Sequence, residues 1–170
     1  MNTHTIILAA GKGTRMNTNL PKVMQPLGGM SLIEHVISTA QEISKKITVV
    51  IGHQKNLLEE HLDEIDPIIE TVNQENQLGT AHAVKTASHL IQDDERVLIL
   101  YGDVPLISNK TIQSLLDSEN NCTLLSMILS DPTGYGRIVS NEENLALKII
   151  EQKDASEDER KIKEVFTGIL

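Results

Sequence analysis

The sequence predicts an α/β fold, with a mostly parallel, Rossmann-like sheet and helices on both faces. Short apolar, β-branched runs alternate along the chain with segments whose apolar residues fall at helical spacing. The runs are apolar at successive positions, which is typical of parallel strands buried on both faces. The 170 residues fit one domain, and its core must be aliphatic because aromatic residues make up only 2% of the chain.

The first half of the chain alternates predicted strands and helices. A strand over residues 3–10 ends at Gly11, and a glycine-rich loop follows it. Ser31 is expected to cap the next helix, because Glu34 three residues later completes a capping-box pattern. The elements predicted here are strands over 3–10, 46–52 and 67–72, the last with Pro67 at its start, and helices over 32–40 and 55–65.

The second half continues the same alternation. A helix opens just after Gly79, and a further helix is capped by Ser108. Cys122, the single cysteine, lies in an apolar run and is expected to be a small core residue. The elements predicted here are helices over 80–91 and 109–116 and strands over 95–103, 122–129 and 162–170. Because ligands of open α/β sheets bind at the carboxyl ends of the strands, the glycine-rich loop and Asp103 mark the expected site.

The net charge of the chain limits the kinds of binding partner to expect. The chain has 24 acidic and 15 basic residues, a formal net charge of −9, and such a surface repels polyanions. Nucleic acids and anionic membranes are therefore not expected to bind, although a few local donors can still hold a small anion. No apolar stretch approaches the ~18 residues of a membrane span, and the amino-terminal residues lack a signal-peptide pattern, so a cytoplasmic location is expected.

The loop after the first strand is suited to phosphate. It reads LAAGKGTRMNTNLPK over residues 8–22, where glycines let backbone N–H groups approach phosphate oxygens. Arg15 offers a planar guanidinium group that suits bidentate binding of a phosphate, and Lys22 offers a mobile positive charge. A Walker loop is excluded because Gly13 stands where Ser or Thr is needed, and a dinucleotide fingerprint is excluded because Met16 replaces its third glycine. A plain βα turn with two glycines stays open as the alternative.

These residues resemble a known signature. LAAGKGTRM followed by PK is similar to the signature of the sugar-nucleotide pyrophosphorylases and related nucleotidyltransferases. Four further segments resemble, in the same order, the bacterial bifunctional N-acetylglucosamine-1-phosphate uridylyltransferases that also carry a glucosamine-1-phosphate acetyltransferase. They are QENQLGTAHAV (74–84), YGDVPLI (101–107), PTGYGRIV (132–139) and IIEQKDAS (149–156). The resemblance implies a fold of the nucleotide-diphospho-sugar transferase type over nearly the whole chain.

The resemblance also implies a reaction and its residues. UTP and N-acetylglucosamine-1-phosphate would give UDP-N-acetylglucosamine and pyrophosphate, a step of cell-wall precursor synthesis, with Mg²⁺ as cofactor. Arg15 and Lys22 would be catalytic, and Asp103 would hold the Mg²⁺ ion. The implied nucleotide-binding residues are Leu8, Ala9, Ala10, Gly11, Gly13, Lys22, Gln74, Gln77, Gly79 and Thr80, and the implied sugar-binding residues are Tyr101, Gly136 and Glu151. Taken singly, these segments are also compatible with helix caps, a hairpin turn and a solvated charge.

The chain departs from the family pattern in two places. Phe166 stands where the family has an Asn that contacts the sugar, and phenylalanine cannot make that hydrogen bond. Residues 1–170 are expected to form a single nucleotidyltransferase domain truncated at its carboxyl end, without the second metal ligand, an Asn, or the acetyltransferase β-helix. Relatives form trimers through that β-helix, so a monomer is expected here. Two alternatives stay open: transfer to another sugar or of another base, and a non-catalytic nucleotide-binding module.

Overall fold

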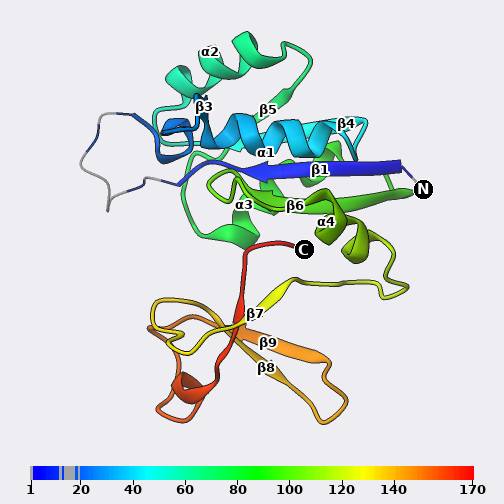
Figure 1. Ribbon diagram of the computed structural model, residues 1–170. Coiled ribbons are helices and arrows are strands. Elements are labelled where there is room, and N and C mark those ends of the chain that lie inside the picture. The colour runs from blue at the N-terminus through cyan, green and yellow to red at the C-terminus, as the bar shows by residue number, and fades with distance from the viewer. Residues whose placement is uncertain (1, 12, 14–17, 19) are drawn as a thin grey trace. The chain divides into compact units, whose positions relative to one another are not determined.

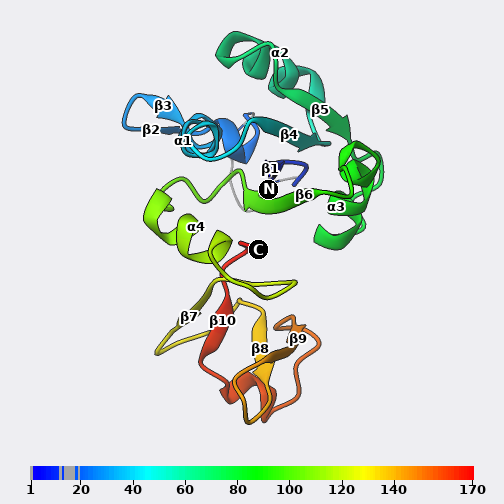
Figure 2. The same ribbon diagram turned by 90° about the vertical axis from the view of Figure 1, so that its right-hand side faces the viewer.

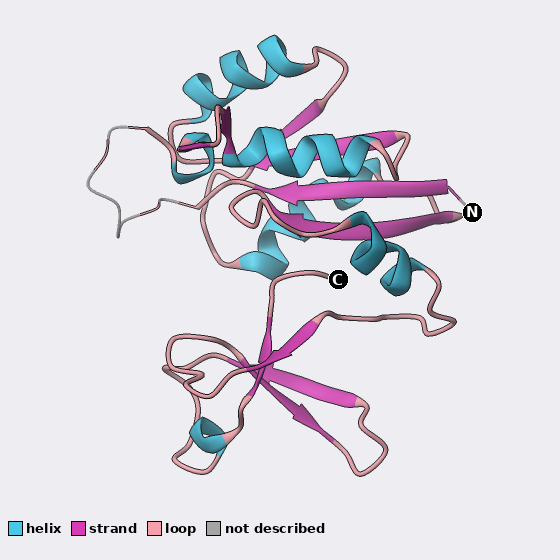
Figure 3. Ribbon diagram, viewed as in Figure 1, coloured by secondary structure: helices cyan, strands magenta, loops and turns pink. Residues whose placement is uncertain are grey.

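The computed structural model describes residues 2–11, 13, 18 and 20–170, and the chain divides into two compact units, residues 1–117 and 118–170. The core of the first unit is a parallel sheet (Figures 1 and 3). Among the described residues its strand order is β5-β4-β1-β6, and every neighbouring pair is parallel. The strands are β1 (Asn2–Leu8), β4 (Lys46–Ile51), β5 (Glu70–Asn73) and β6 (Glu95–Tyr101). The predicted α/β class and parallel sheet are confirmed.

The two central strands explain why their sequences are apolar at successive positions. Ile6 and Ile7 of β1 and Val49 and Val50 of β4 are all fully buried, so both faces of these strands are covered. Helices α1 (Leu32–Gln41) and α3 (Thr80–Ala87) both contact β1 and β4 and lie on opposite faces of the sheet (Figures 1 and 2). The remaining helices of this unit are α2 (Lys55–Ile65), α4 (Asn109–Leu116) and the short 3-10 helices η1 (Lys22–Met24) and η2 (Ser88–Leu90). A small β2–β3 hairpin (Pro26–Leu27 and Met30–Ser31) precedes α1.

The strand order creates a switch point beside β1. From β1 the chain proceeds outward through β4 to β5, and it then returns through α3 to β6 on the other side of β1. Connections leaving β1 and β6 therefore diverge at their carboxyl ends, where Leu8 pairs in register with Tyr101. A crevice for ligands is expected at such a point.

Two helix starts are formed as their sequences predict. At α1 the Ser31 hydroxyl accepts a hydrogen bond from the Glu34 N–H, and the Glu34 carboxylate accepts one from the Ser31 N–H. At α4 the Ser108 hydroxyl accepts a hydrogen bond from the Thr111 N–H. Both caps satisfy backbone donors that have no partner inside their helix.

The capping box of α1 makes a pH-dependent contribution that can be measured. The Ser31 hydroxyl first, and then its backbone N–H, hold the pKa of Glu34 below its ordinary 4.5. Since the folded-state pKa is the lower one, this stabilisation is present above the unfolded pKa and disappears as the pH falls through the folded pKa. We expect the gap in urea midpoint between the wild type and Glu34→Gln to narrow as the pH falls from about 5 to about 3. Exposed Glu64 on α2 gives the control, Glu64→Gln, and a gap that stays constant would contradict the prediction.

The second unit is built differently from the first. Its strands form an antiparallel sheet with the order β7-β10-β8-β9 among the described residues. The elements are β7 (Ser126–Ile128), β8 (Arg137–Ser140), β9 (Ala146–Ile150), β10 (Glu164–Phe166) and the 3-10 helix η3 (Glu159–Lys161). The strand predicted over 122–129 is thus shorter than expected and belongs to this antiparallel sheet. Likewise, the strand predicted over 162–170 is reduced to β10.

Other boundaries also differ from the prediction. The third strand begins at Glu70 rather than Pro67, because the Ile68 and Ile69 N–H groups are turned back onto Asp66. The helix predicted over 80–91 leaves α-helical geometry after Ala87 and ends as η2. The prediction for Cys122 is wrong: it is exposed, because it lies in an irregular segment before β7. In the described part of the chain, no helix combines the length and apolar character that crossing a bilayer would require.

Candidate nucleotide-binding site

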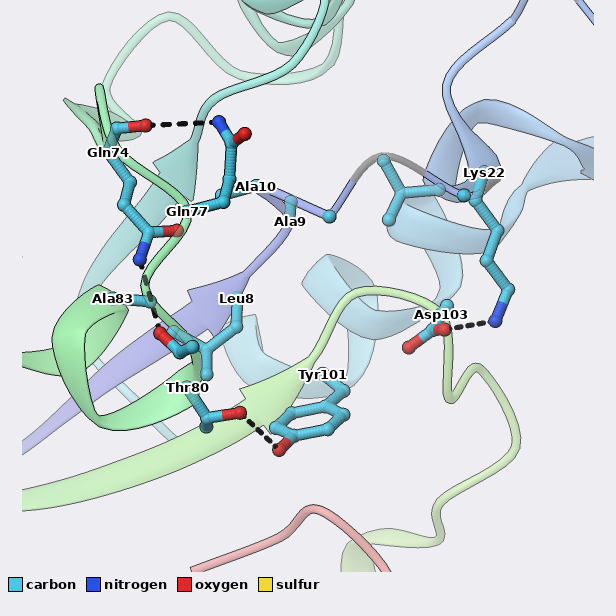
Figure 4. A pocket seen from close by; sticks show the side chains of 14 residues that line it. Leu8, Ala9, Ala10, Lys22, Gln74, Gln77, Thr80, Ala83, Tyr101 and Asp103 are labelled. Atoms are coloured by element: carbon cyan, nitrogen blue, oxygen red, sulfur yellow. Dashed lines mark hydrogen bonds and ion pairs between the residues drawn. The ribbon is translucent and has the colours of Figure 1, made fainter. Parts of the chain in front are cut away.

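A pocket of about 480 Å³ opens at the carboxyl ends of the parallel strands (Figure 4). Its walls come from the loop after β1, the segment between β5 and α3, and the turn after β6. It is lined by Leu8, Ala9, Ala10, Gly11, Gly13, Lys22, Val23, Gln74, Gln77, Gly79, Thr80, Ala83, Tyr101 and Asp103. Every predicted nucleotide-binding residue therefore lines this one pocket, together with Asp103 and Tyr101. Arg15, predicted to be catalytic, lies outside the described residues.

The floor of the pocket is the end of β1. The Ala9 N–H donates to the Val50 carbonyl at 2.8 Å, and the Gly102 N–H donates to the Leu8 carbonyl at 3.0 Å, which continues the sheet past the last strand residues. Gly52 packs tightly against this floor. A Cβ atom there would lie 2.9 Å from the Ala10 Cβ and 3.1 Å from the Ala10 carbonyl oxygen. The pocket thus depends on close contact between the chain segments that follow β1 and β4.

The phosphate loop returns to the pocket at Lys22. Gly13 has a φ of +57°, a left-handed conformation that suits glycine, and a Cβ atom there would lie 3.0 Å from the Lys22 Cβ. A side chain at position 13 would therefore displace Lys22. At Gly11, by contrast, none of the described residues comes within 4 Å of the position of a Cβ atom.

Lys22 and Asp103 form an ion pair at one side of the pocket, although 81 positions separate them in the sequence (Figure 4). Lys22 begins η1, and Asp103 follows β6. Their side chains are 43% and 26% exposed, so both charged groups are accessible to a ligand. Since such a pair is screened by water, it contributes little to folding, and its position in the pocket favours a role in binding.

The opposite wall carries amide and hydroxyl groups. Gln74 is 3% exposed, and its Nε2 donates to the Gly79 carbonyl at 3.2 Å. Nε2 of Gln77 donates to the Gln74 carbonyl at 3.3 Å, and the Thr80 and Tyr101 hydroxyls are 3.1 Å apart. Gly79 adopts a φ of +101° as the residue before α3. This wall is therefore ordered by its own hydrogen bonds and suits a flat, polar ligand group.

The other predicted sugar-binding residues lie in the second unit. Gly136 and Glu151 flank the β8–β9 hairpin, and a Cβ atom at position 136 would lie 2.9 Å from Ile149 Cγ2 and 3.8 Å from Glu151 Oε1. The Phe166 N–H donates to the Gly136 carbonyl at 2.9 Å. Gly136, Glu151 and Phe166 are therefore neighbours, whereas Tyr101 lines the pocket of the first unit.

Several contributing residues were not predicted. Val23 and Ala83 complete the lining of the pocket, and Gly52 supports its floor. In the second unit Arg137 is 1% exposed, donates to the Tyr135 carbonyl, and reaches Gln152 Oε1 with Nη2 at 2.6 Å. Its place beside Gly136 in GYGRI was the available signal, but burial of its guanidinium could not be read from the sequence.

One family model matches most of the chain. It is the MobA-like NTP transferase domain, and it matches residues 5–153. The chain belongs to this family. The match spans both units and includes every residue of the pocket. The pocket of this MobA-like NTP transferase domain lies at the carboxyl ends of the parallel strands, where ligands of such sheets bind.

Two curated relatives show which kind of enzyme the chain resembles. The chain is 45% identical over 170 residues to the bifunctional protein GlmU of Marinobacter nauticus, with 98% of this chain and 37% of the relative covered. It is 45% identical over 168 residues to the bifunctional protein GlmU of Xanthomonas campestris pv. campestris, with the same coverage. These matches confirm the resemblance to bifunctional enzymes drawn from the motifs. The chain spans 37% of the length of these relatives.

Proposed function

We propose that this MobA-like NTP transferase domain transfers the uridylyl group of UTP to N-acetylglucosamine-1-phosphate, giving UDP-N-acetylglucosamine and pyrophosphate. The observation that carries the proposal is the gathering of the implied nucleotide-binding residues, the Lys22 ammonium and the Asp103 carboxylate around one pocket at the switch point of the sheet. The similarity to bifunctional GlmU proteins supports the choice of substrates.

The nucleotide would lie along the pocket. Backbone N–H groups of the loop at Gly11 and Gly13 suit phosphate oxygens, and Lys22 supplies a mobile positive charge beside them. The base would meet the wall formed by Gln74 and Gln77, whose amides can pair with donors and acceptors of a pyrimidine edge. Arg15, on the same loop in the sequence, is proposed to brace the leaving pyrophosphate.

Asp103 fits a divalent cation. No cluster of three or more His, Cys, Asp or Glu side chains that could hold a metal ion occurs within residues 2–11, 13, 18 and 20–170. A single accessible carboxylate combined with phosphate oxygens and waters is, however, the usual arrangement for Mg²⁺. We therefore propose Asp103 as the protein ligand of Mg²⁺, which when bound would neutralise phosphate charge. Lys22, already paired with Asp103, would stand beside the same phosphates.

The chemistry needs no covalent enzyme intermediate. An oxygen of the sugar phosphate attacks the α-phosphorus of UTP, the bond to the bridging oxygen of the β-phosphate breaks, and pyrophosphate leaves with the electron pair. Catalysis then consists of positioning and charge stabilisation by the groups around the phosphates. Gly136 and Glu151 are proposed to contact the acetamido sugar, so that residues 1–170 act as one nucleotidyltransferase domain.

Calorimetric titration with nucleoside triphosphates in the presence of Mg²⁺ tests the proposal. We expect UTP to bind more tightly than CTP, GTP or dTTP, and pyrophosphate to appear when N-acetylglucosamine-1-phosphate is added. Tighter binding of another nucleotide would overturn the choice of base. Binding of UTP without pyrophosphate release would identify a nucleotide-binding module instead, and Phe166→Asn is the variant with which to test whether the missing amide is the reason.

A further inference from the structure

We propose that His82 is a positioning residue for base selection, because its Nδ1 holds the Gln74 amide with the carbonyl oxygen facing the pocket. The proposal rests on the proposed function, in which the base lies against Gln74. His82 is on α3 and does not line the pocket itself. It would act only through the orientation of the Gln74 side chain.

The Gly79 carbonyl and His82 Nδ1 together hold the Gln74 amide, and the Gly79 carbonyl shows which way the amide points. A carbonyl oxygen can only accept a hydrogen bond, so the group facing it at 3.2 Å must be the Gln74 Nε2 rather than Oε1. The same Nε2 lies 2.9 Å from His82 Nδ1. Because an amide nitrogen can only donate a hydrogen bond, Nδ1 must accept this one and therefore carries a lone pair. His82 is therefore the tautomer protonated at Nε2.

Both partners are held by the fold. The Gln74 N–H donates to the Ile51 carbonyl at 2.8 Å, which fixes the backbone beside the end of β4. His82 sits in the first turn of α3, where the Ala83 N–H donates to the Gly79 carbonyl at 3.1 Å. The helix is packed on the sheet through Ala83 and Ala87, which belong to one core cluster with Ile6 and Val50. The His82–Gln74 contact is therefore set by packed secondary structure.

As a result, the Gln74 side chain presents a hydrogen-bond acceptor to the pocket. With Nε2 engaged, the Gln74 amide oxygen turns toward the strand ends (Figure 4), and the residue is 3% exposed, so water competes little for it. Uracil presents a donor, N3–H, whereas cytosine presents a lone pair at N3. The Gln74 oxygen would accept a hydrogen bond from uracil N3–H but would repel the lone pair of cytosine N3. A buried acceptor that faces a lone pair weakens binding.

Two substitutions at position 82 test whether His82 acts as a hydrogen-bond acceptor or only fills space. In His82→Asp the side chain can only accept, so the Gln74 Nε2 keeps its partner. In His82→Lys it can only donate, so it competes for the Gln74 oxygen and favours the reversed amide. UTP and CTP carry the same phosphates, so changes in charge or in the folded fraction affect both equally and cancel in the ratio of their dissociation constants.

The experiment measures that ratio by calorimetry with Mg²⁺ for the wild type and both variants. We expect the preference for UTP over CTP to be kept in His82→Asp and to fall about tenfold or more in His82→Lys. An unchanged ratio in His82→Lys, or an equal loss in both variants, would overturn the role of His82 while leaving the proposed function intact. A wild type without preference for UTP would overturn the proposed function, and this inference with it.

Discussion

Lys22→Ala is expected to lower the turnover number of uridylyl transfer about a hundredfold or more, the scale of losing one preorganised group that stabilises charge in the transition state. The ammonium lies in the pocket beside Asp103, and both side chains are accessible to phosphate. The measurement is the rate of pyrophosphate release at saturating UTP and sugar phosphate. Folding should be nearly unaffected, because an exposed ion pair contributes little to it.

The matched control for Lys22→Ala is Lys110→Ala, which removes an exposed lysine of α4 that does not line the pocket. It changes the net charge of the protein by the same amount. A loss of tenfold or less in Lys22→Ala, or a similar loss in the control, would remove Lys22 from the mechanism.

Gly52→Ala is expected to reduce the free energy of unfolding of the first unit by about 1–3 kcal/mol, the range for forcing an extra carbon into a packed site. The new Cβ would lie 2.9 Å from the Ala10 Cβ and 3.1 Å from the Ala10 carbonyl oxygen, and the backbone must move to relieve both contacts. It would also lie 3.0 Å from Gln77 Nε2, and because Ala10 and Gln77 line the pocket, affinity for UTP should fall as well. Urea denaturation and calorimetry give the two quantities.

Gly11→Ala is the comparison for this substitution. Gly11 also lines the pocket, but among the residues that the structure describes a Cβ atom there meets no atom within 4 Å. It should therefore leave the free energy of unfolding nearly unchanged. Equal stabilities of the two variants would show that the segments after β1 and β4 can separate without cost.

The parallel sheet was predictable because burial on both faces leaves a clear pattern. Residues around Ile6 and Val49 are apolar at successive positions, and only a covered central strand tolerates this. The second unit gave no comparable signal. The apolar run over 122–129 is equally compatible with a buried parallel strand, yet Met127 and Ile128 are 40% and 77% exposed in a short antiparallel strand. An apolar run by itself does not identify the sheet that receives it.

Recognition of the site depended on motifs and not on spacing. Lys22 and Asp103 meet because β1 and β6 are neighbours in the sheet. The order of the strands decides this, and it cannot be read from the number of residues between them. Gly52 was missed because a single glycine after a strand is ordinary until its neighbours are known. The contact between His82 and Gln74 was missed because it depends on how α3 is placed against the end of β5.

The walls of the pocket come from three segments, spread over positions 8 to 103, that only the assembled sheet brings together. An unfolded chain consequently lacks the proposed site, and UTP bound there would shift the folding equilibrium toward the native first unit. At a free UTP concentration of about a hundred times the dissociation constant, the native first unit should gain about 2.7 kcal/mol. UTP at this concentration is therefore expected to slow proteolysis of the first unit, because proteases cleave the unfolded form.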